Sequence, residues 1–342
     1  MHVAASPAFA DSFGNRYTGL LYTALQELDV TVEEWRPTLR QPSVDIVHLH
    51  WPEIPVNLLK PSHAAVRTSQ LLSALAAARA RGARVVWTAH NTQSHTQRRP
   101  ATERAFWRVF DRLIDGWLTL SSAAVPEILH RHPRLARVPH AVTPHGHYRG
   151  AYADTTTRAE ARGKLGLDST DRVLCFLGQV RPYKGVNRLV DVFRAMPEPD
   201  LRLLVAGRAD ETTAQQITAA AAGDKRIRLS LAPVPDDELQ LWLRAADVAV
   251  FPYEGVLNSG SALLALSFDL PVLAPSLGAI PELSATVPRW LQLYTGELTA
   301  DHLRAALTNR PAGRPDLTPL DWAVSARQTL ALYDEIARPR AR

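Results

Sequence analysis

The chain has 342 residues, of which 46% are hydrophobic and 21% charged, and this composition and length suit a globular protein of two domains. The balance excludes a disordered chain. A single cysteine excludes an intrachain disulfide and fits the reducing cytoplasm. Residues 1–10 lack the pattern of a signal peptide, and no apolar run approaches the roughly 20 residues that span a bilayer. We therefore expect a cytoplasmic protein that reaches the inner face of the cell membrane only peripherally.

Positive charge is concentrated in the first part of the chain. Residues 1–150 contain 17 Lys and Arg against 11 Asp and Glu, whereas the net charge of the whole chain is +5. A basic half that faces anionic lipid or a lipid diphosphate is one explanation, and a surface with excess arginine is the other. The basic residues are scattered and form no recognised nucleic-acid-binding motif, so we expect no nucleic acid partner.

Strand and helix patterns alternate through the first 150 residues. Such alternation predicts a parallel sheet with helices on both faces, in which ligands bind beyond the carboxyl ends of the strands. That rule selects Asp11, Glu53 and His90 as candidates for a cleft. The expected strands are 2–8, 31–35, 45–51, 84–89 and 117–120, and the expected helices are 17–28, 66–81 and 103–115.

The segment 140–157 is rich in Pro, Gly and Thr, and we expect the chain to cross between domains there. An amino-terminal Rossmann-like domain is expected over 1–149, and a second over 150–316. The second half repeats the alternation. Its expected strands are 172–177, 201–206, 227–231, 248–251 and 271–275, and its expected helices are 186–196, 214–222, 236–245 and 262–268.

One loop of the second half has the chemistry of an anion site. It follows the apolar strand 248–251 and leads into a helical run through cap-forming and small residues. Free amide groups and the helix dipole at such a helix start favour phosphate. An ordinary strand-to-helix cap is the alternative. The expected diphosphate-binding residues of this loop are Asn258, Ser259, Gly260 and Ser261.

A second loop strengthens this hypothesis. The strand 172–177 ends at Gly178, and Arg181 and Lys184 follow it three residues apart. Arg offers a planar fork and Lys a point charge, and both suit a diphosphate, although each cation alone is also typical of a solvated surface. Two such loops in one α/β domain favour a nucleotide-sugar site. The residues that we expect to line its nucleotide and sugar parts are Gly178, Gly207, Tyr253 and Glu254.

Short motifs in a characteristic order extend the interpretation to a family. They are HLHWPE at 48–53, HGHYR at 145–149, RPYKGV at 181–186, NSG at 258–260 and PVLAP at 271–275. With them the chain resembles the GT-B-fold β-mannosyltransferases of bacterial exopolysaccharide assembly, of the xanthan GDP-mannose:glycolipid type. The resemblance runs from about residue 15 to about residue 322.

The resemblance implies a fold, an activity and partners. It implies two Rossmann-like domains facing across a cleft, with a final helix in 317–342 that crosses back to the first domain. It also implies transfer of a hexose, mannose from GDP-mannose, to a lipid-linked oligosaccharide or another glycoside. No metal or other cofactor is implied, because basic side chains and helix dipoles stabilise the departing diphosphate.

One departure from a common pattern concerns the stereochemistry. Retaining GT-B enzymes usually carry two glutamates separated by seven residues, and here Val256 and Leu264 occupy those positions. Glu254 lies two residues too early to replace the first. The resemblance therefore implies inversion, whereas the sequence itself shows only that the retaining signature is absent.

An inverting transfer needs a base for the acceptor hydroxyl. Glu53 and His90 rank together as candidates and Asp11 third, since a histidine titrates nearest to neutral pH and a carboxylate becomes basic enough when it is buried. Each could instead be a cap or a loop hydrogen-bonding residue. Eleven of the twelve histidines precede residue 150, but without a zinc-binding spacing we expect no metal. The pair Asp236 and Asp237 is expected to cap a helix.

The segment 98–117 combines apolar residues at helical spacing with five arginines. It could lie on an anionic membrane, but we favour packing against the sheet with an arginine-rich outer surface. Acidic residues in the same segment weaken the membrane interpretation; they are Glu103, Asp111 and Asp115.

Three other functions remain open from the sequence. A GT-B enzyme could use a UDP-, ADP- or TDP-hexose on a small-molecule acceptor. A nucleotide-sugar epimerase would isomerise or hydrolyse the sugar without an acceptor. A non-catalytic nucleotide-sugar-binding subunit would bind the donor without turnover.

Overall fold

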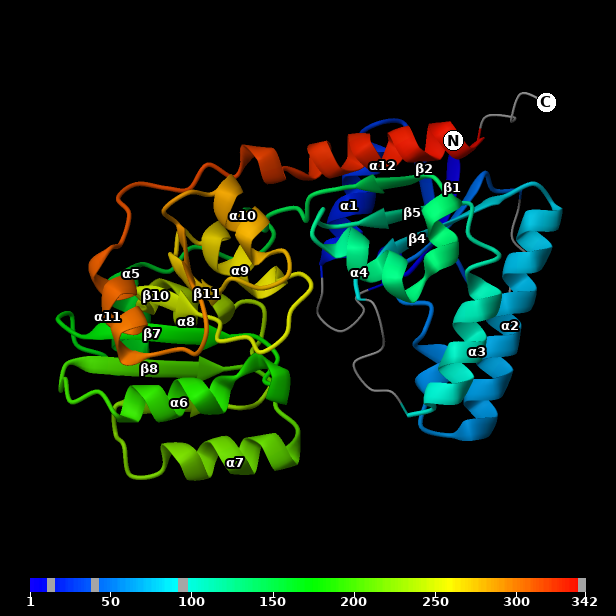
Figure 1. Cartoon of the computed structure of the whole chain (residues 1–342). Helices are drawn as coiled ribbons and strands as arrows, with labels where there is room; N and C mark the ends of the chain where they lie inside the picture. Colours follow the sequence, from blue (N-terminus) through cyan, green and yellow to red (C-terminus); the bar gives the residue numbers. More distant parts are fainter. Residues whose placement is uncertain (11–15, 38–42, 92–97, 338–342) are drawn as a thin grey trace. The chain divides into compact units, whose positions relative to one another are not determined.

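The computed structural model describes residues 1–10, 16–37, 43–91 and 98–337. The candidate Asp11 therefore lies outside the described residues. The chain forms two units: unit 1 comprises Met1–Gly146 and Leu320–Arg342, and unit 2 comprises His147–Pro319. Each contains a parallel sheet of six described strands flanked by helices (Figure 1), so the predicted doubly wound α/β fold class is confirmed.

The sheet of unit 1 has the strand order β2-β1-β3-β4-β5-β6. On β1, which lies next to the edge strand β2, Val3 pairs with Val32 on one side and with Ile46 on the other, and all three side chains are buried. Apolar runs of this kind are typical of parallel strands that are covered on both faces. The strands are β1 (His2–Ser6), β2 (Thr31–Glu34), β3 (Ile46–Leu49), β4 (Arg84–Ala89), β5 (Gly116–Thr119) and β6 (His140–Val142).

Helices cover both faces of this sheet. Figure 1 shows α1 and α12 together on one face and α2 and α3 on the other. The last helix is part of the unit 1 core, because Leu332 and Tyr333 are buried beside Leu21 and Leu25 of α1. The helices are α1 (Tyr17–Gln26), η1 (Pro55–Asn57), α2 (Pro61–Ala80), α3 (Pro100–Phe110), α4 (Ala124–Arg131), η2 (Pro133–Arg137) and α12 (Trp322–Ala337).

The sheet of unit 2 has the order β12-β11-β10-β7-β8-β9. Its strands are β7 (Arg172–Leu177), β8 (Leu201–Ala206), β9 (Ile227–Ser230), β10 (Val248–Val250), β11 (Val272–Pro275) and β12 (Leu291–Tyr294). Its helices are α5 (Arg158–Lys164), η3 (Pro182–Lys184), α6 (Val186–Arg194), α7 (Glu211–Ala221), α8 (Leu239–Ala245), α9 (Gly260–Ser267), α10 (Ile280–Thr286), α11 (Ala300–Thr308) and η4 (Thr318–Leu320).

Helix α6 illustrates how the sequence pattern becomes packing. Its buried residues are Val186, Leu189, Val190 and Phe193, which recur at the spacing of one helix face. The adjacent strand β7 contains Cys175, whose side chain is fully buried. Burial raises the pKa of this thiol to about 12, so the cysteine is a core residue, as its place in an apolar strand predicted.

Some predicted boundaries and elements were wrong or incomplete. The helix expected over 66–81 begins at Pro61, because proline at the first helical position does not break a helix. The helix expected from Asp236 begins at Leu239, and its N-cap residue Glu238 makes no side-chain cap hydrogen bond, so the predicted aspartate cap is wrong. The elements that were not predicted are short, and they are α4, β6, α5, α10, β12 and α11.

Candidate functional site

The strand order identifies one ligand-binding edge in each unit. In unit 2 the chain passes from β7 to β8 on one side, and later returns to place β10 on the other side of β7. Ligands of doubly wound sheets bind outside the carboxyl ends of the strands at such a switch point. The loops that leave β7 and β10 are the two that the sequence selected for phosphate chemistry.

The structure brings these two loops into contact. The Glu254 amide donates to the Tyr183 carbonyl at 2.9 Å. Gly185 has a left-handed φ of 68°, and a Cβ at this position would lie 2.0 Å from the Pro252 carbonyl oxygen. A Cβ on Gly178 would lie 2.6 Å from the Ser261 hydroxyl oxygen. The approach is therefore so close that only glycine fits at these positions.

Lys184 is the residue in which the two loops meet. Its ammonium group lies 4.1 Å from the ring centroid of Tyr253 and 5.4 Å from that of Tyr183. Within the described part of the chain Lys184 forms no ion pair with a carboxylate. Burial lowers the pKa of its ammonium group to about 8 because desolvation disfavours the charged form, and at pH 7 the group is still mostly protonated.

The start of α9 adds amide donors to the same place. Ser259 is the N-cap, and its hydroxyl accepts from the Ala262 amide at 3.1 Å and bonds the Tyr253 hydroxyl at 2.7 Å. The Ser259 side chain therefore builds the site. The amides of Gly260 and Ser261 lie in the first helical turn, where backbone donors lack intrahelical acceptors. Asn258 directly precedes the cap.

Arg181 and Gly207 extend the site toward β8. The Arg181 guanidinium lies 3.8 Å from a carboxylate oxygen of Asp210, and both side chains are substantially exposed. Such a pair is weak and leaves the guanidinium able to bind another anion. Asp210 is also the N-cap of α7, where its carboxylate accepts from the Thr213 amide at 3.0 Å. Gly207 follows β8 directly, next to Gly178.

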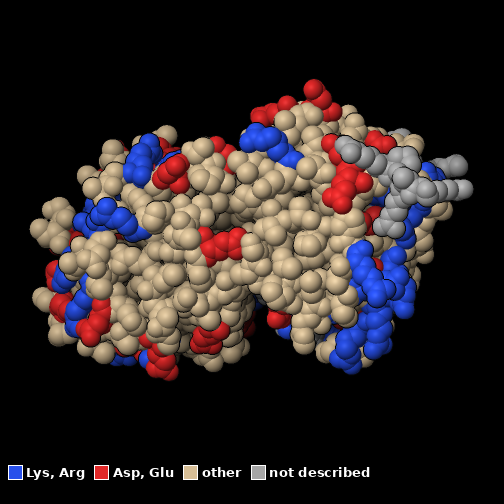
Figure 2. Space-filling view, turned by 45° about the horizontal axis from the view of Figure 1, so that its top comes forward, with Lys and Arg blue, Asp and Glu red and all other residues tan. Residues whose placement is uncertain are grey.

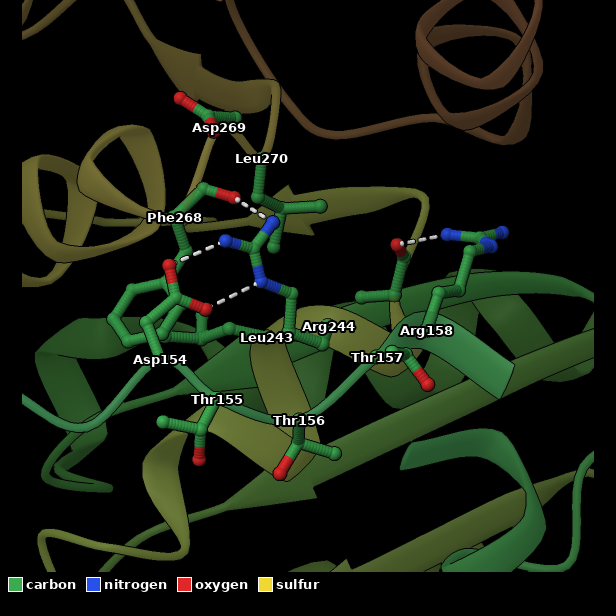
Figure 3. A pocket seen from close by; sticks show the side chains of 11 residues that line it. Asp154, Thr155, Thr156, Thr157, Arg158, Leu243, Arg244, Phe268, Asp269 and Leu270 are labelled. Carbon is green, nitrogen blue, oxygen red and sulfur yellow. Dashed lines mark hydrogen bonds and ion pairs between the residues drawn. The ribbon is translucent and has the colours of Figure 1, made fainter. Parts of the chain in front are cut away.

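A separate hollow of about 360 Å³ in unit 2 does not combine a ligand-binding edge with a cation that could bind an anion (Figure 3). It lies where β10 and β11 begin, at the opposite end of the strands from a ligand edge. Arg244 donates to both carboxylate oxygens of Asp154, and Arg158 donates to the Ala246 carbonyl at 2.8 Å. Its cations are thus already paired, and we do not assign a ligand to it.

In unit 1 the loops after β3 and β4 carry two of the predicted catalytic residues. Glu53 lies in the first loop with only 7% of its surface exposed. Burial raises the pKa of its carboxyl to about 7, and the negative charge of Glu103 acts in the same direction. His90 follows β4, and its ring stacks on Trp51 at 4.5 Å between centroids. The structure therefore brings His90 into contact with the loop that carries Glu53.

Behind His90 lies a chain of buried hydrogen bonds. His90 Nε2 is 2.9 Å from His50 Nδ1, and His50 Nε2 is 2.6 Å from the Tyr22 hydroxyl. The same hydroxyl is 2.8 Å from His48 Nδ1. His48 also bonds the Tyr333 hydroxyl at 2.6 Å and Thr88 at 2.7 Å. The chain thus links α1, β3, β4 and α12.

Burial keeps these histidines neutral. It lowers the pKa of His48 to about 3 and that of His145 to about 4, and it lowers the pKa of His50 and His90 well below the ordinary value. Hydrogen bonds occupy both ring nitrogens of His48 and of His50. No group of three or more His, Cys, Asp or Glu in the described residues could hold a metal ion.

Sequence reasoning did not find the partners of this network. The alternation of His48 and His50 along β3 showed that they share a face, but Tyr22 and Tyr333 lie 26 and 285 residues from His48. Only the fold brings them together. In unit 2 the role of Asp210 beside Arg181 was also missed, although an acidic residue before a helical run is a recognisable cap signal.

Comparison with known proteins identifies the family. A model described as "Glycosyl transferases group 1" matches residues 171–307, which contain both of the joined loops. The GDP-mannose:glycolipid 4-beta-D-mannosyltransferase of Xanthomonas campestris pv. campestris is 36% identical over 293 residues, covering 81% of this chain and 76% of that protein. The chain belongs to the group 1 glycosyltransferases.

Solved glycosyltransferases have the same fold. A glycosyltransferase from Rickettsia africae matches with a TM-score of 0.67 at 13% identity, over 98% of both chains. The sucrose-phosphate synthase of Thermosynechococcus elongatus matches with a TM-score of 0.65 at 15% identity, over 98% of this chain and 96% of that one. These likenesses confirm the GT-B fold that the motifs implied.

Replacing Lys184 with alanine is expected to weaken the binding of nucleoside diphosphates about 10- to 100-fold, because a charge-assisted contact contributes roughly 1.5–3 kcal/mol. Arg181→Ala is expected to act in the same direction. Isothermal titration calorimetry measures both, with Lys225→Ala, an exposed lysine of unit 2, as the matched control. Affinity should also fall as the pH rises through about 8, where free Lys184 loses its proton, and Lys184→Arg should remove that fall. Unchanged affinity in both alanine variants would reject the diphosphate site.

The buried histidines make stability depend on pH. Their pKa values are lower in the folded state, so their contribution is complete above pH 6.5 and is lost as the pH falls. We expect the free energy of unfolding of unit 1 to decrease between pH 6.5 and 4. Urea unfolding measures this free energy at each pH. For His48→Gln its dependence on pH should be less steep than for wild type, by close to one proton taken up on unfolding. A slope that matches the wild type would contradict the buried, neutral state of His48.

Proposed function

We propose that this glycosyltransferase transfers mannose from GDP-mannose to a glycolipid acceptor. The observation that carries the proposal is the joined pair of loops in unit 2. There Lys184, which forms no ion pair with a carboxylate of the described residues, and the start of α9 provide positive charge for a diphosphate. The choice of GDP-mannose and of a glycolipid is supported by the activity in the name of the Xanthomonas relative.

The donor site that we propose consists of the residues predicted from the sequence. Lys184, Arg181 and the amides of Gly260 and Ser261 bind the diphosphate, and they stabilise its charge as it departs. Tyr253, Glu254, Gly178 and Gly207 line the nucleotide and the sugar. These groups balance the charge of the leaving diphosphate, so the proposed transfer requires no metal ion and no other cofactor.

We further propose that the transfer inverts the anomeric configuration. The name of the Xanthomonas relative is that of a 4-beta-D-mannosyltransferase that uses GDP-mannose, and formation of a β-mannoside from an α-linked donor supports inversion. In this chain the positions of the retaining glutamate pair hold Val256 and Leu264, whose side chains have no acid or base chemistry. A single displacement by the acceptor hydroxyl needs only one base.

Glu53 is the base that we propose, with His90 as the competing candidate. A pKa of about 7 makes the Glu53 carboxylate a better proton acceptor at neutral pH than an ordinary carboxylate. The pKa of His90 is shifted in the unfavourable direction for a base, and its Nε2 is already bonded to His50. His90 is therefore better suited to hold a substrate hydroxyl.

The basic surface of α2 and α3 supports peripheral contact with an anionic membrane. Figure 2 shows Lys and Arg gathered over this part of unit 1. The acidic residues that argued against such contact do not face outward, because Glu103 is 2% exposed and Asp111 is 9% exposed. No helix among the described residues is both long and apolar enough to cross a bilayer. The exposed cations are Lys60, Arg67, Arg81, Arg98, Arg104, Arg108 and Arg112.

The test of the function is transfer by wild type and Glu53→Gln, with the product anomer assigned by proton NMR. Wild type should form a β-mannoside from GDP-mannose and a glycolipid. Glu53→Gln should lose transfer at least 100-fold while GDP affinity stays unchanged, because removing a general base typically costs about 10²–10⁴-fold. The folded-state pKa of Glu53 is raised, so its stability contribution is lost as the pH rises to about 7, and the variant should therefore unfold at a higher temperature at pH 8.

His90→Gln is the comparison variant for the base. Transfer that survives in Glu53→Gln and is abolished in His90→Gln would assign the base to His90. An α-linked product would reject inversion. GDP binding without transfer to any acceptor would favour a non-catalytic subunit.

Membrane contact is tested by reversing two charges on α3. Arg104→Glu with Arg108→Glu should weaken binding to phosphatidylglycerol vesicles at least tenfold, since each basic residue near an anionic surface contributes about 1 kcal/mol. Cosedimentation measures the effect, and Lys164→Glu with Lys225→Glu in unit 2 provides the same change of charge elsewhere. Equal losses in the two double variants would show that only net charge matters.

A further inference from the structure

Unit 1 contains a hollow of about 440 Å³ that the reaction described above does not use. It lies beyond the carboxyl ends of β1, β2 and β3, and is closed by η1 and α2. This is the switch point of the unit 1 sheet, because β2 and β3 lie on opposite sides of β1. Its volume is within the range of small-molecule sites.

The lining of this hollow is mainly apolar. It is built from aromatic, aliphatic and proline side chains, which include Trp35, Trp51, Leu49, Ile54, Leu58 and Leu71. A hydrocarbon chain gains about 25 cal/mol for each Å² of apolar surface that it buries in such a site.

The carboxylate in the lining is already engaged. Glu34 Oε2 accepts from the amides of Ala8, Phe9 and Ala10 at 2.9, 3.2 and 3.4 Å. It therefore holds the loop after β1 in place. The other polar side chains of the lining are those of Ser6, Arg67 and Gln70, and the buried Gln70 Oε1 has no hydrogen-bond partner among the described residues. A sugar ring has more hydroxyls than these groups can pair, and each hydroxyl left unpaired costs about 1–3 kcal/mol. The chemistry favours a hydrocarbon over a glycan.

The rim of the hollow combines exposed aliphatic side chains with cations, as a site for an amphipathic ligand would. Ile54 is 39% exposed, and the neighbouring Leu59 and Val66 are 75% and 55% exposed. Two cations accompany these aliphatic side chains: Arg67 lines the hollow and Lys60 directly precedes α2. An apolar interior with a cationic rim matches an apolar chain that carries an anionic head group.

Trp51 places the hollow beside the proposed chemistry of unit 1. Its side chain lines the hollow and stacks on His90 at 4.5 Å between ring centroids. Glu53 follows two residues later in the same loop. Glu53 itself is not part of the lining, but its chain neighbours Pro52 and Ile54 are, so an occupant of the hollow contacts the loop that carries the proposed base. This position points to the acceptor and not to the donor, whose proposed site is in unit 2.

We propose that this hollow binds the hydrocarbon chain of the lipid-linked acceptor, with the lipid phosphate toward Arg67 and Lys60. The proposal rests on the proposed function, since it assigns a subsite to the glycolipid. It explains why apolar side chains are left exposed along η1 and the start of α2. It also predicts that the enzyme recognises the lipid directly, in addition to its glycan.

The test is a titration of the full chain with farnesyl phosphate, followed by tryptophan fluorescence because Trp35 and Trp51 line the hollow. Leu58→Gln should weaken binding roughly tenfold by placing an amide in the apolar lining. Val109→Gln is the matched control, since Val109 is an exposed aliphatic residue of unit 1 that lies on α3 and is part of neither the lining nor the rim, and the affinity of this variant should equal that of wild type. Ile54→Gln is a second lining variant on the exposed rim, in case Leu58→Gln fails to fold.

The outcomes separate this proposal from the proposed function. GDP affinity, measured on the same samples, reports on unit 2 alone. Farnesyl phosphate binding that is weakened by Leu58→Gln or Ile54→Gln and not by Val109→Gln supports the lipid subsite, even if GDP fails to bind. Absence of farnesyl phosphate binding, equal effects of lining and control variants, or equal binding of inorganic phosphate would overturn it. Binding of a lipid-free oligosaccharide acceptor that Leu58→Gln weakens, with no binding of farnesyl phosphate, would assign the hollow to a glycan.

Discussion

The close approach of the loops after β7 and β10 is the constraint on which the proposed donor site depends. Two glycines allow it, because a Cβ at Gly178 or Gly185 would collide with Ser261 or with the Pro252 carbonyl. The approach positions Lys184 against the Tyr253 ring and next to the start of α9. A cation and helix amides then converge on one place, and no carboxylate of the described residues forms an ion pair with Lys184. This is the charge distribution that a diphosphate requires.

Unit 1 differs from unit 2 in holding a network of polar side chains in its buried interior. A continuous chain of hydrogen bonds runs from Thr88 to His90 through His48, Tyr22 and His50. Because these side chains are hydrogen-bonded, burying them in the neutral form costs little free energy, whereas burying them in the charged form would cost much. Glu53 differs from the histidines, because burial disfavours the charged form that an ordinary carboxyl has at neutral pH and raises its pKa to about 7. A pKa shifted by burial in this way is typical of groups that act as acids or bases.

The sequence predicted the architecture well because its signals are local. Apolar strands such as 172–177 and helix patterns such as 186–196 carry their periodicity within a few residues, and the loops between them carried the glycines and cations of the proposed donor site. Short elements such as β6 were missed because three residues hold too little periodicity to detect.

The candidate base and its surroundings were harder to predict. The pKa of Glu53 and the network behind His90 arise from burial and from residues far away in the chain, such as Tyr333 on the last helix. The hollow at β1 to β3 combines side chains from four separate segments, and no single sequence motif indicates it. Such features follow from the topology of the sheet, which decides which loops become neighbours.

The most direct test of the central claim is calorimetric titration of the purified chain with GDP, UDP, ADP and TDP and with their sugars. Our account predicts that nucleoside diphosphates bind and that GDP and GDP-mannose bind most tightly. Preference for another base would retain the diphosphate site and reject GDP-mannose as the donor. Absence of binding by every nucleotide would contradict the claim that the joined loops of unit 2 form a donor site.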